Sequence, residues 1–410
     1  MNILGPNFKV LVATFSLWAN GRRHPTNGSV EPLIAFFTPL VKKFVLIDQT
    51  VPGSETVIPK IEVYAKGKKM QDFHPAKWIN FLSPFLLGAN QPGTRISFKI
   101  RDFLSVIDWC LRDRNTQYDY FIGLECINAL AGIFLRKISF IKKVIYYVSD
   151  YSPQRYPNKL FNSLYLRLDR WAAMHADYIW DVSKAIQPAR IKAGLNPKRS
   201  APCIHVPNAL FPSQIKYRSL DEINRFSIVF AGSLGQENGP DVVIEALPAV
   251  IRKYPQTKLH IVGGDRTNIE RLKTKVQELS LSRNVKFYGV ILDPVEMSKL
   301  IGSCYLAVAP YRAFPGSPRY FGDAGKIRVY AAAGLPIITT YVPPLGVEVK
   351  KKGAALLVND TAKEYAKAIS KIFSDKKIYL KLRKQAILFA KDNIWENTFI
   401  QAFKKMQMHN

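Results

Sequence analysis

Six short apolar segments, separated by helical patterns, recur along the second half of the sequence. Each is rich in β-branched residues and ends at a glycine, a proline or a polar residue; they are 226–233, 258–264, 284–290, 304–310, 335–340 and 354–358. Amphipathic helical patterns such as "RTNIERLKTKVQELS" lie between most of them. Continuous apolar strands that alternate with helices indicate a parallel sheet covered on both faces. This half therefore predicts a doubly wound α/β domain.

The first half repeats this pattern less regularly. Strand candidates lie at 8–15, 43–49, 118–124, 142–150 and 177–183, and helices are expected over 97–113 and 160–175. A Pro-rich, polar segment near 201–219 separates the halves. In a chain of 410 residues we therefore expect two Rossmann-like domains, over 1–205 and 206–390, followed by a helical segment over 391–410. Ligands of such sheets bind beyond the carboxyl ends of the strands.

The positive charge of the chain restricts its partners. The sequence has 59 Lys and Arg against 31 Asp and Glu, a net charge of +28, and each half contributes +14. A folded protein of this charge favours nucleic acid, an anionic membrane or phosphorylated small molecules, although a generally basic proteome would also account for it. Because no zinc-finger, RRM or basic-helix signature is present, we predict no nucleic-acid partner. A basic nucleic-acid-binding protein remains the alternative outside the enzymes.

The sequence also indicates the compartment. The four cysteines form no C-x-x-C motif and lie in apolar surroundings, so a zinc site or a disulfide framework is not expected. The N-terminus lacks the features of a signal peptide, and no uninterrupted apolar run reaches about 18 residues. These features fit a cytoplasmic protein without a membrane-spanning helix.

Glycines and cations gather in the loops after two predicted strands of the second domain. In "FAGSLGQENGPD", Gly232 and Gly235 precede a helix, so that backbone N–H groups can receive a diphosphate, although a tight turn without a ligand also uses glycine. In "GSPRYFGDAGKIRVYAAAG", Gly325 opens a helix that carries Lys326 and Arg328. A helix start with a nearby lysine is a favourable diphosphate site.

Three further segments carry candidate site residues. Tyr311 ends a strand, where it either contacts a donor nucleotide or packs as a core aromatic. The loop 16–29 carries Arg22, Arg23 and His24, which suit a phosphate or carboxylate but also an ordinary surface loop. Asp150 follows the apolar strand 142–150 and is either a turn cap or a catalytic acid or base.

Together these segments resemble the GT-B glycosyltransferases, and within them the group related to family 4. The run "CYLAVAPYR…GKIRVYAAAGLPIITT" is similar to the family's donor region, "K-x-x-E-Y-M-A-x-G-x-P-V-I", and "FAGSLGQENGPDVVIEAL" is similar to its "G-R-L-x-x-x-K-G-x-D-x-L-I-x-A" turn. The segment "LYLRLDRWAAMHADYIWDVSKAI" resembles the one that closes the N-terminal domain. The resemblance covers roughly residues 118–400. It implies two Rossmann-like domains facing each other across a cleft, with a final helix that crosses back to the first.

The sequence also departs from the family pattern. The family's diphosphate-binding Arg and Lys fall at Ser233 and Asn238, and its ribose-binding Glu falls at Val329. Lys326 is kept. This combination is similar to membrane-associated bacterial glucuronosyltransferases of the xanthan-assembly type, whose "S-D" base and "F-E-S" segment match Ser149-Asp150 and Glu125. A catalytically degenerate GT-B scaffold is the alternative.

The resemblance implies a hexosyltransferase of class EC 2.4 that uses a UDP- or GDP-linked sugar and no cofactor. The sequence contains no D-x-D, which argues against a metal clamp, so Lys326 would stabilise the leaving diphosphate and Asp150 would be the base. Gly232, Ser233, Tyr311, Gly325 and Arg328 complete the expected donor site, and Arg22, Arg23, His24, Glu125 and Arg155 the acceptor site.

The expected acceptor is a lipid-diphosphate-linked or other saccharide of bacterial surface polysaccharide biosynthesis. The mixed basic and apolar segments 77–88 and 134–143 suit peripheral attachment to an anionic membrane, here the inner face of the plasma membrane. The segment 134–143 also has the pattern of a lead-in to a core strand.

Overall fold

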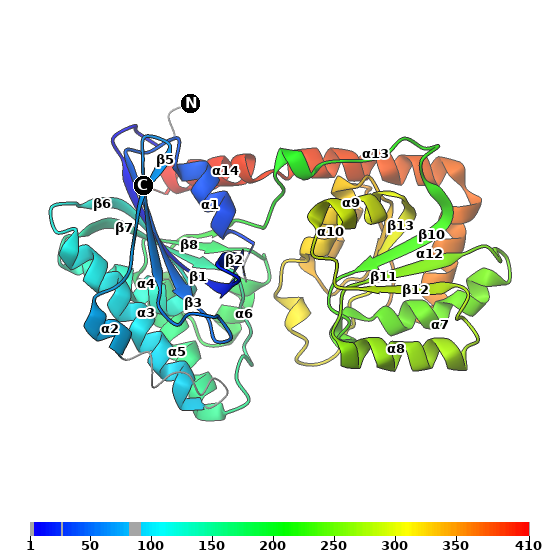
Figure 1. The fold of residues 1–410 in the computed structure, drawn as a ribbon, viewed down its shortest axis with the longest axis horizontal. Helices are drawn as coiled ribbons and strands as arrows, with labels where there is room; N and C mark the ends of the chain where they lie inside the picture. The colour runs from blue at the N-terminus through cyan, green and yellow to red at the C-terminus, as the bar shows by residue number, and fades with distance from the viewer. Residues whose placement is uncertain (1–3, 26–27, 82–91, 410) are drawn as a thin grey trace. The chain divides into compact units, whose positions relative to one another are not determined.

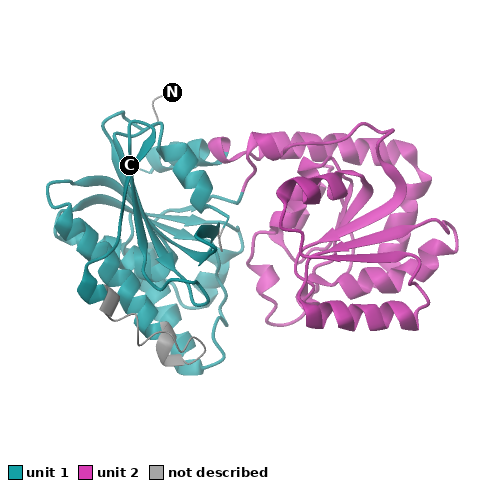
Figure 2. Cartoon of the chain, in the orientation of Figure 1, with its two compact units in different colours: residues 1–208, 398–410 teal, residues 209–397 magenta. Residues whose placement is uncertain are grey.

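The structure, a computed structural model, describes residues 4–25, 28–81 and 92–409, which form two compact units (Figures 1 and 2). Unit 1 comprises Met1–Asn208 and Thr398–Asn410, and unit 2 comprises Ala209–Asn397. The division between the units lies after residue 208, where the sequence predicts 205. The chain returns to unit 1 at residue 398, inside the predicted last helical segment.

Unit 1 contains a mixed sheet of nine strands in the described residues, in the order β5-β4-β3-β1-β6-β7-β8-β9, with β2 paired to β1 (Figure 1). The strands are β1 Lys9–Ala19, β2 Arg22–Pro25, β3 Lys43–Thr50, β4 Lys60–Ala65, β5 Lys68–Phe73, β6 Tyr118–Leu124, β7 Ile141–Val148, β8 Tyr178–Asp181 and β9 Cys203–His205. The helices are α1 Val30–Phe37, α2 Lys77–Phe81, α3 Pro92–Arg112, α4 Glu125–Lys137, α5 Lys159–His175, α6 Ile186–Lys192 and α14 Trp395–Gln407. From β3 to β9 all neighbouring strands are parallel, whereas β2, β4 and β5 pair antiparallel.

Unit 2 contains a fully parallel sheet in the order β12-β11-β10-β13-β14-β15. Its strands are β10 Asn224–Ala231, β11 Lys258–Val262, β12 Val285–Gly289, β13 Cys304–Ala309, β14 Ile337–Thr339 and β15 Ala355–Leu357. Its helices are α7 Pro240–Ile251, α8 Arg266–Glu278, α9 Pro294–Gly302, α10 Gly325–Ala332, α11 Pro344–Lys351, α12 Ala362–Ser374 and α13 Lys376–Asp392. The predicted α/β class with two Rossmann-like sheets is confirmed.

The central strand β10 explains why the second sheet is buried on both faces. Ile228 and Phe230 belong to one hydrophobic cluster, and Val229 and Ala231 belong to another. Because successive side chains of a strand point to opposite faces, an uninterrupted apolar run fills two layers of core at once. Because all strands of this sheet are parallel, their carboxyl ends lie at the same edge, where the ligands of such sheets bind.

The first predicted loop has a different conformation. Strand β1 continues to Ala19 and turns back as β2, with Ser16 opposite Pro25, so that the segment 16–25 is a hairpin. Of the helices in the described residues, none is both long enough and apolar enough to cross a membrane.

Candidate active site

Lys326 lies at the carboxyl-terminal edge of the second sheet, in the first turn of α10. Its Nζ is 4.3 Å from the centroid of the Phe230 ring and 4.8 Å from that of Tyr311. It also donates a hydrogen bond to Asn238 Oδ1, over 3.3 Å. The ends of β10 and β13 and the start of α7 thus surround one ammonium group.

Gly232 makes this approach possible. A Cβ atom added at this position would lie 3.2 Å from Lys326 Nζ, and the backbone φ of +139° is one that other residues rarely adopt. The glycine turn after β10 and the helix α10 therefore meet at backbone level. This brings together the two segments in which the sequence predicts donor binding.

The surroundings of Lys326 change its acidity. Burial lowers the pKa of the Lys326 ammonium to about 7; the positive charge of Arg319 lowers this pKa further, and Glu237 opposes the effect. Among the described residues no carboxylate forms an ion pair with Lys326, whose polar partner is the neutral amide of Asn238. A desolvated cation without a carboxylate partner is a strong attractor for an anionic ligand.

The other predicted donor residues differ in how far they are exposed near the Lys326 ammonium. The Tyr311 ring is buried beneath the ammonium, and burial raises the pKa of its hydroxyl. Ser233 is exposed in the turn after β10, and Gly325 is exposed at the start of α10. Arg328, in contrast, is only 2% exposed and pairs with Asp323 over 2.6 Å. Its charge holds the loop before α10, and the side chain is not presented to a ligand.

Two residues of this edge, Arg319 and Glu237, were missed by the sequence reasoning. Arg319 lies in the 3-10 turn Pro318–Tyr320, and its Nη2 is 3.4 Å from Glu237 Oε1. Glu237 also accepts a hydrogen bond from the Asn238 amide over 2.9 Å. The signal in the sequence is the cation in "GSPRY", three residues after a glycine in the same loop.

In unit 1 the structure brings Asp150, Arg155 and Glu125 together after β6 and β7. Arg155 Nη1 donates to the Asp150 carbonyl oxygen over 2.8 Å and lies 3.6 Å from Asp150 Oδ2. The same nitrogen is 3.4 Å from Glu125 Oε2. The Asp150 side chain is 68% exposed, whereas that of Glu125 is 9% exposed. One arginine thus links an open carboxylate to a buried one.

A tight strand-to-helix turn holds Glu125 in place. Its φ is +68°, which is costly for a residue with a side chain. The turn is closed by close contact, because a Cβ atom at Gly123 would lie 2.6 Å from the Ala129 nitrogen. Burial raises the pKa of Glu125, and the charge of Arg155 partly offsets this effect. The charge of Glu125 in turn raises the pKa of Arg155.

The predicted basic loop residues lie on strand β2. Arg22 and His24 are exposed, but Arg23 is engaged. Its Nε lies 2.7 Å from Asp48 Oδ2, its Nη2 lies 2.7 Å from Glu62 Oε2, and its Nη1 lies 3.0 Å from Glu31 Oε1. Arg23 therefore anchors the hairpin to β3 and β4. Within the described ranges, no group of three or more His, Cys, Asp or Glu side chains is arranged to hold a metal ion.

A segment of the second unit matches a known sequence family. Residues 225–375 match the family model described as "Glycosyl transferases group 1". The D-inositol 3-phosphate glycosyltransferase of Corynebacterium jeikeium is 27% identical over 179 residues, which are 41% of this chain and 40% of that protein. The match thus spans about two fifths of that relative's length. The O-antigen biosynthesis glycosyltransferase WbnH of Escherichia coli is 26% identical over 282 residues, 68% of this chain and 74% of WbnH.

The whole fold has solved counterparts. Anabaena HepE in complex with UDP superposes with a TM-score of 0.68 at 17% identity, covering 98% of this chain and 100% of HepE. The chain therefore shares its fold with these GT-B structural neighbours. The segment 225–375 of unit 2 is similar to the glycosyl transferases of group 1.

Proposed function

We propose that the chain transfers a sugar from a nucleoside-diphosphate sugar to a saccharide acceptor. The observation that carries this proposal is the environment of Lys326: a desolvated ammonium at the strand-end edge, with an amide and two aromatic rings as neighbours and no described carboxylate partner. A diphosphate supplies the missing negative charge. Because the leaving diphosphate gains charge as the glycosidic bond breaks, the same ammonium stabilises the transition state more than the substrate.

The relatives support a narrower donor and pathway. HepE has been solved with UDP and with UDP-glucose, and WbnH is named as an enzyme of O-antigen biosynthesis. We therefore infer a UDP-linked donor and an acceptor of bacterial surface polysaccharide biosynthesis. The glycine turn at 232–235, in which Ser233 is exposed, and the start of α10 at Gly325 offer backbone N–H groups to the diphosphate.

Asp150 is the proposed general base. An acceptor hydroxyl must lose its proton as it attacks the anomeric carbon, and a carboxylate that is open to solvent can take it. Arg155 contacts both the carbonyl and the carboxylate of Asp150, so it is a positioning residue for the base. Glu125 in turn fixes Arg155. Attack from the side opposite the leaving group implies inversion at the anomeric carbon.

The acceptor is proposed to be lipid-linked, so the protein would associate peripherally with an anionic membrane. Support comes from α5, where the side chains of Leu160 and Leu164 are 82% and 50% exposed beside Lys159 and Arg167. Phe134, in the predicted segment 134–143, is a further large apolar residue that is 45% exposed, on α4. The segment divides between the end of α4 and the start of β7, and residues 82–88 of the other predicted segment lie outside the described residues.

Calorimetric titration of the full chain with UDP-, GDP- and dTDP-sugars tests the proposal. We expect saturable binding of one of these donors, followed by release of its nucleoside diphosphate when a saccharide acceptor is added. A second candidate function, a GT-B scaffold without catalysis, is favoured by Ser233, Asn238 and Val329, which replace the family's charged residues. Binding without transfer to any acceptor would support the scaffold, and no binding of any donor would contradict both.

A further inference from the structure

Arg319 lies beside Lys326 on a separate loop. It belongs to the turn after Ser317, in the loop between β13 and α10. Its side chain is 38% exposed. A chain of contacts joins it to the lysine: Arg319 to Glu237 at 3.4 Å, Glu237 to the Asn238 amide at 2.9 Å, and Asn238 to Lys326 at 3.3 Å. Two cations thus converge on one turn.

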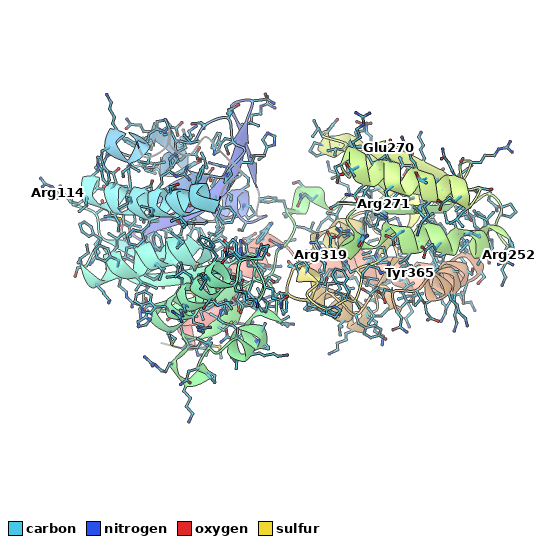
Figure 3. The ribbon with its side chains drawn as sticks, turned by 90° about the horizontal axis from the view of Figure 1, so that it is seen from below. Arg114, Arg252, Glu270, Arg271, Arg319 and Tyr365 are labelled. Carbon is cyan, nitrogen blue, oxygen red and sulfur yellow. The ribbon has the colours of Figure 1, made fainter. Side chains whose placement is uncertain are left out.

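Two neighbouring arginines are engaged by carboxylates, and a third donates to the backbone of the 232–235 turn. Arg312 lies 3.1 Å from Asp241 Oδ2 and 3.3 Å from Asp360 Oδ2, and Arg328 is buried against Asp323. Arg271, which lies on helix α8 (Figure 3), donates a hydrogen bond of 3.2 Å to the carbonyl oxygen of Leu234. Arg319, in contrast, has one carboxylate partner among the described residues, and its Nε makes no hydrogen bond within them although it is screened from solvent. It retains donors for a ligand.

The charges of this turn are unbalanced without a ligand. When Lys326 is protonated, Lys326 and Arg319 carry two positive charges against the one negative charge of Glu237. Repulsion between the two cations disfavours the charged form of Lys326, so the charge of Arg319 lowers the pKa of Lys326. Placing like charges together in a screened site raises the free energy of the unliganded protein, and an anion with two or more negative charges removes this cost.

We propose that Arg319 is a second diphosphate ligand, and that it supplies from the 316–322 loop the charge that Ser233 and Asn238 no longer provide. This inference rests on the proposed function, because it assigns a residue to the same donor site. The guanidinium has paired N–H groups that match two phosphate oxygens, whereas the lysine acts as a single point charge. Glu237 is a positioning residue, which directs Arg319 toward the turn before the donor arrives.

The test compares Arg319→Gln with Arg252→Gln, a matched loss of one positive charge. Arg252 is exposed just after α7, at the opposite end of unit 2 from Arg319 (Figure 3). The full-length variants are titrated with UDP and with uridine, and in parallel with GDP and guanosine. We expect Arg319→Gln to lower the affinity for the nucleoside diphosphate by about tenfold or more. The affinity for the nucleoside should equal that of the wild type. Arg319→Lys should recover part of the loss, and Arg252→Gln should change neither affinity.

The outcomes separate this inference from the proposed function. If the wild type binds a nucleoside diphosphate and Arg319→Gln binds it equally well, Arg319 is not a ligand and the proposed function stands. If the wild type binds none of the nucleotides, both proposals are wrong. An equal loss of nucleoside and nucleoside diphosphate would show general damage to the unit and would also overturn the assignment. A further readout is the pH at which binding weakens, which should rise in Arg319→Gln because Lys326 loses a repelling neighbour.

Discussion

At the residue scale, the proposed donor site depends on the Lys326 ammonium, whose pKa is lowered by burial to about 7. Lys326 is desolvated by aromatic rings and faces a neutral amide, so its charged form is destabilised in the free protein. A bound diphosphate reverses this, because it stabilises the charged form. Binding of a diphosphate and protonation of Lys326 are therefore coupled, and each favours the other.

We predict that donor affinity falls as the pH rises above about 7, where Lys326 loses its proton. The loss should approach tenfold per pH unit until the pKa of the complex is passed, because binding in this range requires uptake of one proton. UDP-glucose is the suitable probe, since a diphosphate esterified at both ends has no ionisation of its own there. Calorimetry in buffers of different ionisation enthalpy measures the proton uptake directly.

Lys326→Gln is the control for this pH dependence. The variant should bind UDP-glucose more weakly at all pH values, and its affinity should be independent of pH near neutrality, because the titrating group is gone. A variant that kept the wild-type pH profile would show that another group titrates and would remove Lys326 from the site.

We predict that Asp150→Asn lowers the rate of transfer by about 10²–10⁴-fold and leaves UDP-sugar affinity unchanged. The amide keeps the shape of the side chain but cannot accept the acceptor proton. Glu125→Gln should have a smaller effect, since Glu125 contacts Arg155 and acts on the base only through it. Steady-state rates and calorimetric affinities of both variants check this. A larger loss in Glu125→Gln than in Asp150→Asn would contradict the assignment of the base.

At the element scale, the last helix stabilises unit 1 through aromatic packing. On α14, Phe399 and Phe403 are buried against Phe36 and Phe37 of α1, and the Phe403 ring lies edge-on to Trp180 of β8 at 5.4 Å. These contacts join three elements far apart in the sequence. Phe399 and Phe403 are therefore part of the core of unit 1, although they follow unit 2 in the chain.

We predict that Phe403→Ala lowers the free energy of unfolding of unit 1 by about 3–5 kcal/mol, the usual cost of truncating a buried phenylalanine. The transition of unit 2 should not change, because the ring packs within unit 1. Urea unfolding followed by circular dichroism measures both transitions, and Lys404→Ala, an exposed neighbour on α14, is the control. Loss of stability in unit 2 with none in unit 1 would contradict the role of this helix.

The elements also show how far the sequence predicts the fold and where prediction fails. The apolar strands of unit 2 and the central strands β6 and β7 were predicted to within a few residues, because strands buried on both faces have uninterrupted apolar runs. Strands β2, β4, β5 and β9 were not predicted. Strand β5, "KKMQDF", is exposed or nearly exposed along its length, so it has no hydrophobic pattern, and its pairing with β4 depends on tertiary context.

The candidate site was predictable to a similar extent. Lys326, Gly232 and Tyr311 lie at strand and helix ends that the pattern locates, and the structure brings them together. The fate of each arginine was not predictable, because it depends on which carboxylate lies nearby in space. Asp323 engages Arg328, and Asp48 engages Arg23, whereas Arg319 has the partner Glu237 from another loop. Sequence spacing carries no information about such pairings.

At the scale of the whole molecule, the net charge of +28 is shared by both halves of the chain, so charge alone identifies no particular face. Exposed apolar side chains indicate which surface is the candidate for membrane contact. Leu160, Leu164 and Phe134 are large exposed side chains on α5 and α4, close in sequence to Lys159, Arg167 and Lys137. An interfacial surface needs both features, because apolar side chains insert between lipids and basic side chains meet anionic headgroups.

We predict that the protein floats with vesicles containing phosphatidylglycerol and that about 0.5 M salt weakens the association, since each basic residue near the surface contributes about 1 kcal/mol that salt screens. Leu160→Glu combined with Leu164→Glu should abolish flotation, because carboxylates on α5 oppose both the insertion and the charge attraction. Leu292→Glu is the matched control, since Leu292 is 86% exposed but lies in unit 2, away from this surface in the sequence. Equal flotation of the double variant and the wild type would exclude α5 as the contact. Flotation that is insensitive to salt would show that the positive charge of the chain has another partner.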